Sequence, residues 1–191
     1  MKRSERGFAL VEILVVMAIV ALIGSAASMA TSQVITGTKR SNDHMTAIRQ
    51  VQNAGYWISR DVLMAQSIAA GDDPETAEIV EFITLNWTDW DEGKKKDSKY
   101  HLVTYSFEDM ADGIGKLKRQ YLIYEDGKEK GNEVTLIAEY IYYDPDNPAS
   151  SSFSPEPDGR WILTIQARKG TATETREYEV DPRVNMQRLM Q

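Results

Sequence analysis

An uninterrupted apolar run near the N-terminus constrains this chain more than any other feature of its sequence. The run extends from Phe8 to Ala30, is 23 residues long and contains one charged residue, Glu12. An α-helix rises about 1.5 Å per residue, so about 20 residues cross the hydrocarbon core of a bilayer. The run is therefore long enough to form a membrane-spanning helix.

Charged residues flank this run unequally. Residues 2–6 read Lys-Arg-Ser-Glu-Arg, and after Ala30 no charge appears until Lys39. Because basic residues collect on the cytoplasmic side of a membrane helix, the pattern predicts a single-pass protein of the cytoplasmic (inner) membrane. Its N-terminus is expected in the cytoplasm and its C-terminal domain outside.

Two ordinary interpretations of the run remain open at this point, a cleaved secretory signal and a generic signal anchor. A signal peptide has an apolar region of about 7–15 residues, which is shorter than this run, although Ser28-Met29-Ala30 would suit a signal peptidase. Neither interpretation explains Glu12. A carboxylate within the bilayer costs about 3 kcal/mol or more, so its presence indicates a function and a partner.

The segment from Lys2 to Met17, KRSERGFALVEILVVM, resembles the class III leader of type IV prepilins and type II secretion pseudopilins. In that family, prepilin peptidase removes a short basic leader that ends in Gly and methylates the new N-terminal residue. The resemblance implies a leader peptide at residues 1–7, cleavage between Gly7 and Phe8, and N-methylation of Phe8. The basic leader residues are Lys2, Arg3 and Arg6.

Glu12 falls at the fifth position of the mature chain that this cleavage would create. The resemblance implies that its carboxylate pairs with the free N-terminal ammonium of a neighbouring subunit and so registers incoming subunits. The physics agrees, since two charges in an apolar bundle each need an opposite charge nearby to remain ionised.

Apolar residues recur at three- and four-residue spacing from Thr38 to Ala70, which is typical of an amphipathic helix. They are Met45, Ile48, Val51, Gly55, Ile58, Val62, Ala65 and Ile68. We therefore expect one long helix over about residues 8–70. Residues 8–30 would be its transmembrane and assembly segment, and residues 31–70 an amphipathic continuation.

Residues 71–191 alternate between apolar and polar side chains and predict a globular β-sheet domain. The expected strands lie at about 79–87, 101–107, 117–123, 134–143, 161–167 and 174–180, separated by turn sequences such as Asp126-Gly127 and Lys130-Gly131-Asn132. A long N-terminal helix followed by an antiparallel meander is an α+β arrangement in which the helix covers the sheet. The leader implies the same pilin-like architecture.

Composition and motifs give no support for an enzyme, a metal site or a cofactor. The chain has no Cys, two His and a formal net charge of −7, which argues against a disulfide scaffold and against direct nucleic-acid binding. Carboxylates in the loops 88–99 and 144–158 do not follow the calcium-loop pattern, so ordinary turns are expected there. His44 and His101 are expected to be structural.

The remaining residues favour one subtype. The segment from Tyr56 to Val62 resembles J-type pseudopilins and W-type minor pilins, as does Tyr100–Tyr105 followed by Leu117–Arg119, and residues 8–38 lack the Pro of many major pilins. The resemblance implies a minor subunit that primes or caps a type IV pilus or a secretion pseudopilus. Its partners would be other pilins or pseudopilins, prepilin peptidase, an inner-membrane assembly platform and membrane lipid.

Two other classes stay open from sequence alone. A signal-anchored extracytoplasmic binding domain unrelated to pili would keep its leader, and an anchored hydrolase would show turnover.

A side-chain cluster at Tyr140, Tyr142 and Tyr143 is expected to be a packed strand, with a subunit-contact face as the alternative.

Overall fold

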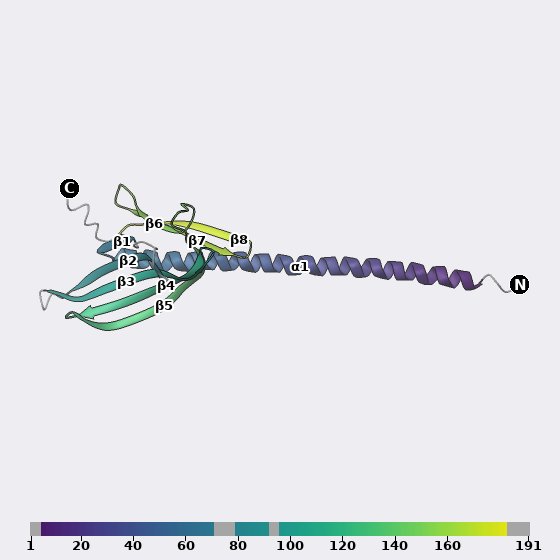
Figure 1. The fold of residues 1–191 in the computed structure, drawn as a ribbon, viewed down its shortest axis with the longest axis horizontal. Coiled ribbons are helices and arrows are strands. Elements are labelled where there is room, and N and C mark those ends of the chain that lie inside the picture. The colour runs from purple at the N-terminus through teal and green to yellow at the C-terminus, as the bar shows by residue number, and fades with distance from the viewer. Residues whose placement is uncertain (1–4, 71–78, 92–95, 183–191) are drawn as a thin grey trace. The chain divides into compact units, whose positions relative to one another are not determined.

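The computed structural model describes residues 5–70, 79–91 and 96–182 (Figure 1). They belong to two compact units, Met1–Asn42 and Asp43–Gln191, which are described separately. The helix α1 (Glu5–Met64) supplies all of the described structure of the first unit and the first element of the second.

The surface of the first unit consists largely of exposed apolar side chains. Residues 10–41 are all exposed, and the large apolar residues between Leu10 and Ile35 have exposed fractions of 48–70%. Among the described residues, α1 is the helix that is long and apolar enough to cross a membrane. Such a surface requires lipid or other helices to cover it, which supports a membrane-spanning helix in this part of the chain.

The helix ends earlier than the sequence pattern predicts. It stops at Met64 rather than near Ala70, and residues Ser67–Ala70 form the short strand β1 instead. The backbone N–H of Gln66 donates to the carbonyl of Asn86, and the Gln66 side chain hydrogen-bonds the Thr88 backbone. Ile68 continues the helical spacing, but pairing with the neighbouring strand takes these backbone groups out of the helix.

The second unit contains an antiparallel sheet in which the strands follow the order β1-β2-β3-β4-β5-β7-β6, with β8 paired to β7. The α+β class is thus confirmed, but the meander holds only as far as β5. The strands are β2 (Ile79–Asp91), β3 (Lys96–Ala111), β4 (Ile114–Glu125), β5 (Lys128–Tyr142), β6 (Ser152–Pro155), β7 (Trp161–Lys169) and β8 (Ala172–Val180).

Three local predictions are wrong. Lys130-Gly131-Asn132 lies inside β5, because the turn before it is made by Asp126 and Gly127, both with positive φ. The loop expected at 88–99 is mostly strand, since β2 continues to Asp91 and β3 begins at Lys96. The loop expected at 144–158 contains β6.

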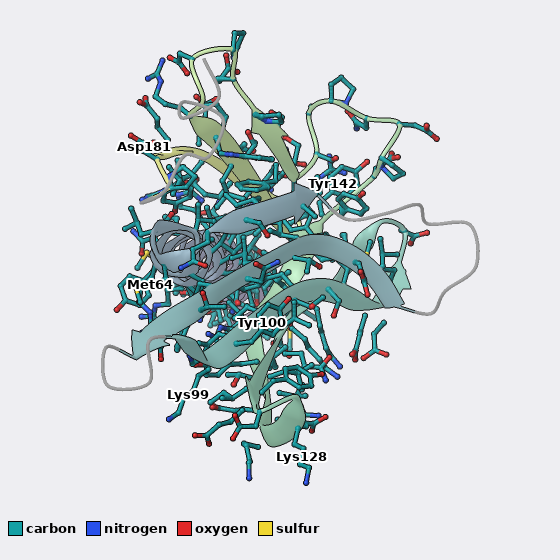
Figure 2. All side chains as sticks on the ribbon, turned by 90° about the vertical axis from the view of Figure 1, so that its left-hand side faces the viewer. Met64, Lys99, Tyr100, Lys128, Tyr142 and Asp181 are labelled. Atoms are coloured by element: carbon teal, nitrogen blue, oxygen red, sulfur yellow. The ribbon has the colours of Figure 1, made fainter. Side chains whose placement is uncertain are left out.

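The apolar stripe of α1 packs on the sheet and forms one core. Figure 2 looks toward the helix end at Met64 and shows strands on two sides of it. The helix contributes Ala47, Val51, Ala54, Ile58 and Val62, and the sheet contributes Ile83, Leu85, Val103, Tyr105, Phe107, Leu117, Ile141, Leu163 and Ile165. Burial of this apolar area is the main stabilising contribution of the body.

Gly55 lets α1 approach β8 closely. A Cβ at this position would lie 2.1 Å from Cζ of Tyr178, whose hydroxyl donates a hydrogen bond to the carbonyl of Val51. The close approach therefore depends on the missing side chain.

We predict that Gly55→Ala lowers the free energy of unfolding by about 1–3 kcal/mol, because the added methyl displaces the Tyr178 ring and breaks its hydrogen bond. The measurement is thermal unfolding of the full-length protein in detergent. Gly37→Ala in the same helix is the matched control, since nothing lies within 4 Å of its Cβ position, and it should be neutral or slightly stabilising. Equal effects of the two substitutions would contradict the packing argument.

Candidate functional site

The residues predicted for processing lie at the start of α1. The backbone of Arg6, Gly7 and Phe8 is helical, whereas Lys2 and Arg3 fall outside the described residues. Glu12 lies four residues after Phe8 in the same helix, and residues at this spacing lie on one face. The backbone of the expected cleavage bond and Glu12 are thus about one helical turn apart.

Glu12 is exposed and has apolar neighbours that are also exposed. Leu10 and Val11 precede it, Ile13 and Leu14 follow it, and their exposed fractions are 60–66%. A carboxylate on such an apolar surface needs a countercharge when hydrocarbon or other helices cover it. Chemically, the arrangement suits an ion pair with a second molecule.

A second polar site, which none of the sequence patterns above predicts, joins α1 to the sheet in the body. Asp61 on α1 accepts hydrogen bonds at Oδ2 from the Tyr105 hydroxyl on β3 and from Nε of Arg119 on β4, each 2.6 Å long. Asp61 is 2% exposed and Arg119 is 5% exposed. We call these three residues the helix–sheet latch.

Burial and mutual charge fix the protonation states of the latch. Burial, followed by the charge of Asp61, raises the pKa of Tyr105 well above its ordinary value, so its hydroxyl stays protonated and donates. Burial alone would lower the pKa of Arg119, but the hydrogen bond and charge of Asp61 more than reverse this and raise it. Each buried polar group thus has the partner that it needs.

Aromatic rings extend the latch on both sides of Arg119. Its guanidinium carbon lies 5.4 Å from the ring centroid of Trp57 on α1 and 4.8 Å from that of Tyr121 on β4. The exposed Arg60 covers the Trp57 ring at 4.6 Å. Of these cation–π contacts, the one between Arg119 and Trp57 joins β4 to α1 and adds to the link between helix and sheet.

His101 is buried beside the latch and is structural, as predicted. Its ring stacks on Trp87 and Tyr121, with centroid distances of 5.2 and 5.8 Å. Nδ1 lies 2.8 Å from the Tyr121 hydroxyl oxygen, and Nε2 lies 3.0 Å from Oδ2 of Asp89. Both ring nitrogens are therefore engaged in holding three strands together.

The loops expected to be turns do not assemble a metal site among the described residues. Asp144 forms an Asx turn, in which Oδ1 accepts from the Asp146 N–H and Oδ2 from the Tyr142 hydroxyl. The side chains of Asp91 and Glu92 fall outside the described residues.

The tyrosine cluster is a packed strand end, as predicted. Tyr143 stacks on Phe107, the buried ring of Tyr142 lies under Arg168, and Tyr140 adopts a positive φ of 61° in a strand bulge.

The latch left a weak sequence signal. The apolar stripe predicted from the sequence does not include Asp61, yet Asp61 lies three residues after Ile58 and four before Ala65, on the same side of α1. Arg119 likewise interrupts the apolar row Leu117-Arg119-Tyr121 of β4. A lone charge of each sign inside two apolar faces that must pack together predicts a buried ion pair. Neither position shows this alone, because the pairing depends on the register between helix and sheet.

We predict that Asp61→Ala lowers the free energy of unfolding by about 3–5 kcal/mol, because it leaves the Arg119 guanidinium buried and unpaired. Glu177→Ala, which removes an exposed charged side chain from β8, should change stability by less than about 0.5 kcal/mol. Adding Arg119→Met to Asp61→Ala should restore part of the loss. Denaturation of the full-length variants in detergent measures this, and an additive double variant would contradict the pairing.

Comparison with known proteins bears on the N-terminal site. A family model, the prokaryotic N-terminal methylation motif, matches residues 2–28. No curated protein and no solved structure matches the chain. The matched residues contain residues 2–7 of the predicted leader, Phe8 and Glu12. With the apolar helix, the motif supports single-pass anchoring in the inner membrane. The chain therefore carries the N-terminal methylation motif of type IV pilin and pseudopilin precursors, and this match supports its assignment to that family.

Proposed function

We propose that this protein is a minor subunit of a type IV pilus or a type II secretion pseudopilus, and that it primes or caps assembly. The observation that carries the proposal is the match of residues 2–28 to the N-terminal methylation motif, together with the exposed apolar helix that follows. The motif family is structural, and its members act by associating with one another.

In this proposal prepilin peptidase cuts between Gly7 and Phe8 and methylates the new amino group of Phe8. Residues 1–7 are the leader, with Lys2, Arg3 and Arg6 on the cytoplasmic side. Residues 8–30 form the transmembrane and assembly segment, residues 31–70 continue the chain into the body, and residues 71–191 complete the globular domain. Cleavage creates an N-terminal ammonium group at Phe8, and the exposed Glu12 of a neighbouring subunit can pair with it.

Assembly then moves the apolar helix from lipid into a bundle of similar helices. Because lipid tails are as apolar as leucine side chains, packing and polar pairing rather than the hydrophobic effect favour the bundle. A pair between Glu12 and the Phe8 ammonium of a neighbour would set the axial position of each subunit. The neighbours are other pilins or pseudopilins, delivered by an inner-membrane platform.

The minor role is supported by departures from the usual major subunit. Residues 8–38 contain no Pro, and the chain has no Cys for a C-terminal disulfide. The body carries the latch instead, and both its Asp61 and the neighbouring Trp57, which contacts the latch residue Arg119, lie within the segment that resembles J-type and W-type subunits.

We predict that Gly7→Ala blocks processing, because the peptidase must accommodate the backbone before the cleaved bond and a methyl obstructs it. The full-length precursor should accumulate in the inner membrane, as measured by N-terminal sequencing of the purified protein. Gly24→Ala is the matched control and should be processed normally. A Gly7→Ala protein that begins at Phe8 would contradict the assignment, and a wild-type protein that begins at Met1 would favour a signal-anchored binding domain.

We predict that Glu12→Ala permits cleavage and methylation but lowers incorporation into the fibre at least tenfold, because the neighbouring ammonium loses its countercharge. Incorporation is measured as the fraction of the subunit in sheared or co-purified fibres. Ser25→Ala removes another exposed polar side chain from the same helix and should leave incorporation unchanged. Normal incorporation of Glu12→Ala would overturn the role of Glu12 in registration.

A further inference from the structure

One edge of the sheet is open in the body. β5 pairs with β4 from Lys128 to Tyr142, but it meets β7 through a single residue pair, Ile141 and Ala167. Because the two strands are antiparallel, residues of β5 before Ile141 would lie opposite residues after Ala167, and β7 ends at Lys169. Most of the outer edge of β5 therefore has no strand beside it.

Side chains of α1 cap the upper part of this edge. The N–H of Glu139 donates to Oε1 of Gln50 over 2.8 Å, and Nδ2 of Asn53 donates to the carbonyl of Ile137. Among the described residues, no comparable contact reaches the edge between Gly131 and Leu136. The helix thus satisfies the backbone groups beside it, while the run Gly131–Leu136, which pairs with β4 on its inner side, has an open outer edge among the described residues.

This run lacks the features that usually protect an exposed edge. Glu133 is its one charged residue, whereas Val134 and Leu136 are 59% and 48% exposed. The other long edge strand, β8, carries four charged residues among nine, Glu174, Arg176, Glu177 and Glu179. Charges blunt an edge against pairing with other chains, so β8 is protected and this part of β5 is not.

The two sides of the open edge differ in chemistry. Val134 and Leu136 pair with Gln120 and Lys118 of β4. These two β4 residues alternate with the latch residue Arg119, which faces the helix, so Val134 and Leu136 lie on the face away from the helix. On the helix side, a shallow hollow of about 400 Å³ lies where Gln50 and Asn53 reach the strand. It is lined by Arg49, Gln50, Gln52, Asn53 and Tyr56.

We propose that the edge of β5 from Gly131 to Leu136 binds an extended segment of a neighbouring subunit, which adds to the sheet as a strand. Six residues span about 20 Å, the length of an ordinary short strand. Because α1 and β7 close one end of the edge, it accommodates one short segment rather than a complete sheet. Backbone hydrogen bonds would hold the segment, and alternate side chains would give specificity.

The surroundings specify the chemistry of that segment. Side chains on its outer face would be apolar, to cover Val134 and Leu136. Those on its inner face would be polar or acidic, to enter the hollow beside Arg49 and Gln52. This inference rests on the proposed function, because the neighbour belongs to the assembled fibre.

The absence of Cys from the chain makes a clean labelling test possible. Val134→Cys in the full-length protein places a single thiol on the open edge, and Thr173→Cys places an exposed thiol on β8. Cells that assemble the fibre and cells blocked by Glu12→Ala are treated with a membrane-impermeant maleimide. The edge thiol should be labelled at least fivefold more slowly in assembled subunits, and the β8 thiol should not change.

Hydrogen exchange separates an added strand from a surface that merely covers the edge. Backbone amides of residues 131–136 should exchange at least tenfold more slowly in assembled than in unassembled protein, with no change in β8. Val134→Lys with Leu136→Lys should reduce assembly, whereas Thr171→Lys with Thr173→Lys should not.

The outcomes distinguish the two proposals. Assembly with a freely labelled edge and unprotected amides would overturn the docking site and leave the proposed function standing. Labelling that slows without amide protection would also overturn strand addition. Absence of any assembly of the wild-type chain would instead refute the proposed function.

Discussion

The constraint on which the rest of the structure depends is that one helix must serve two environments. The first half of α1 exposes an almost continuous apolar surface that only lipid or other helices can cover. The part from Asp43 onward carries a single apolar stripe and buries it on a sheet. The composition of the whole chain conceals this division, because a polar, acidic body outweighs one apolar span.

A helix that serves two environments must be fixed to its domain at a defined register, and two features of the body do this. The close approach of Gly55 to Tyr178 fits the helix against β8, while the latch fixes it to β3 and β4. A buried ion pair contributes little net stability compared with an apolar replacement, but it penalises every register that separates its charges. The packing and the latch therefore act together, one through shape and the other through charge.

The leader and the membrane span can be predicted from sequence, because each depends on residues adjacent in the chain. The apolar run is recognised as a membrane span from its length alone. Gly7, Phe8 and Glu12 are identified by their positions relative to the start of that run. The α+β class follows from two periodicities. In contrast, the end of the helix at Met64, the strand through Gly131 and the pairing of Asp61 with Arg119 depend on contacts between distant segments. Ile68 fits a helical stripe equally well. However, the backbone N–H of Gln66 donates to the Asn86 carbonyl on β2, and Ile68 pairs with Leu85 of that strand instead of continuing the helix.

The open edge of β5 illustrates the same limit. Nothing in the sequence of residues 131–136 shows that β7 leaves the strand after one pair, or that Gln50 and Asn53 stop short of it.

In the proposed assembly, the exposed Glu12 acts together with the processed N-terminus of a neighbouring subunit. The intact mass of the mature protein, purified from its own membrane, is the decisive measurement. The expected mass is that of residues 8–191 plus one methyl group, located at Phe8 by fragmentation. A mass that includes residues 1–7, or an N-terminus elsewhere in the apolar run, would contradict this proposal.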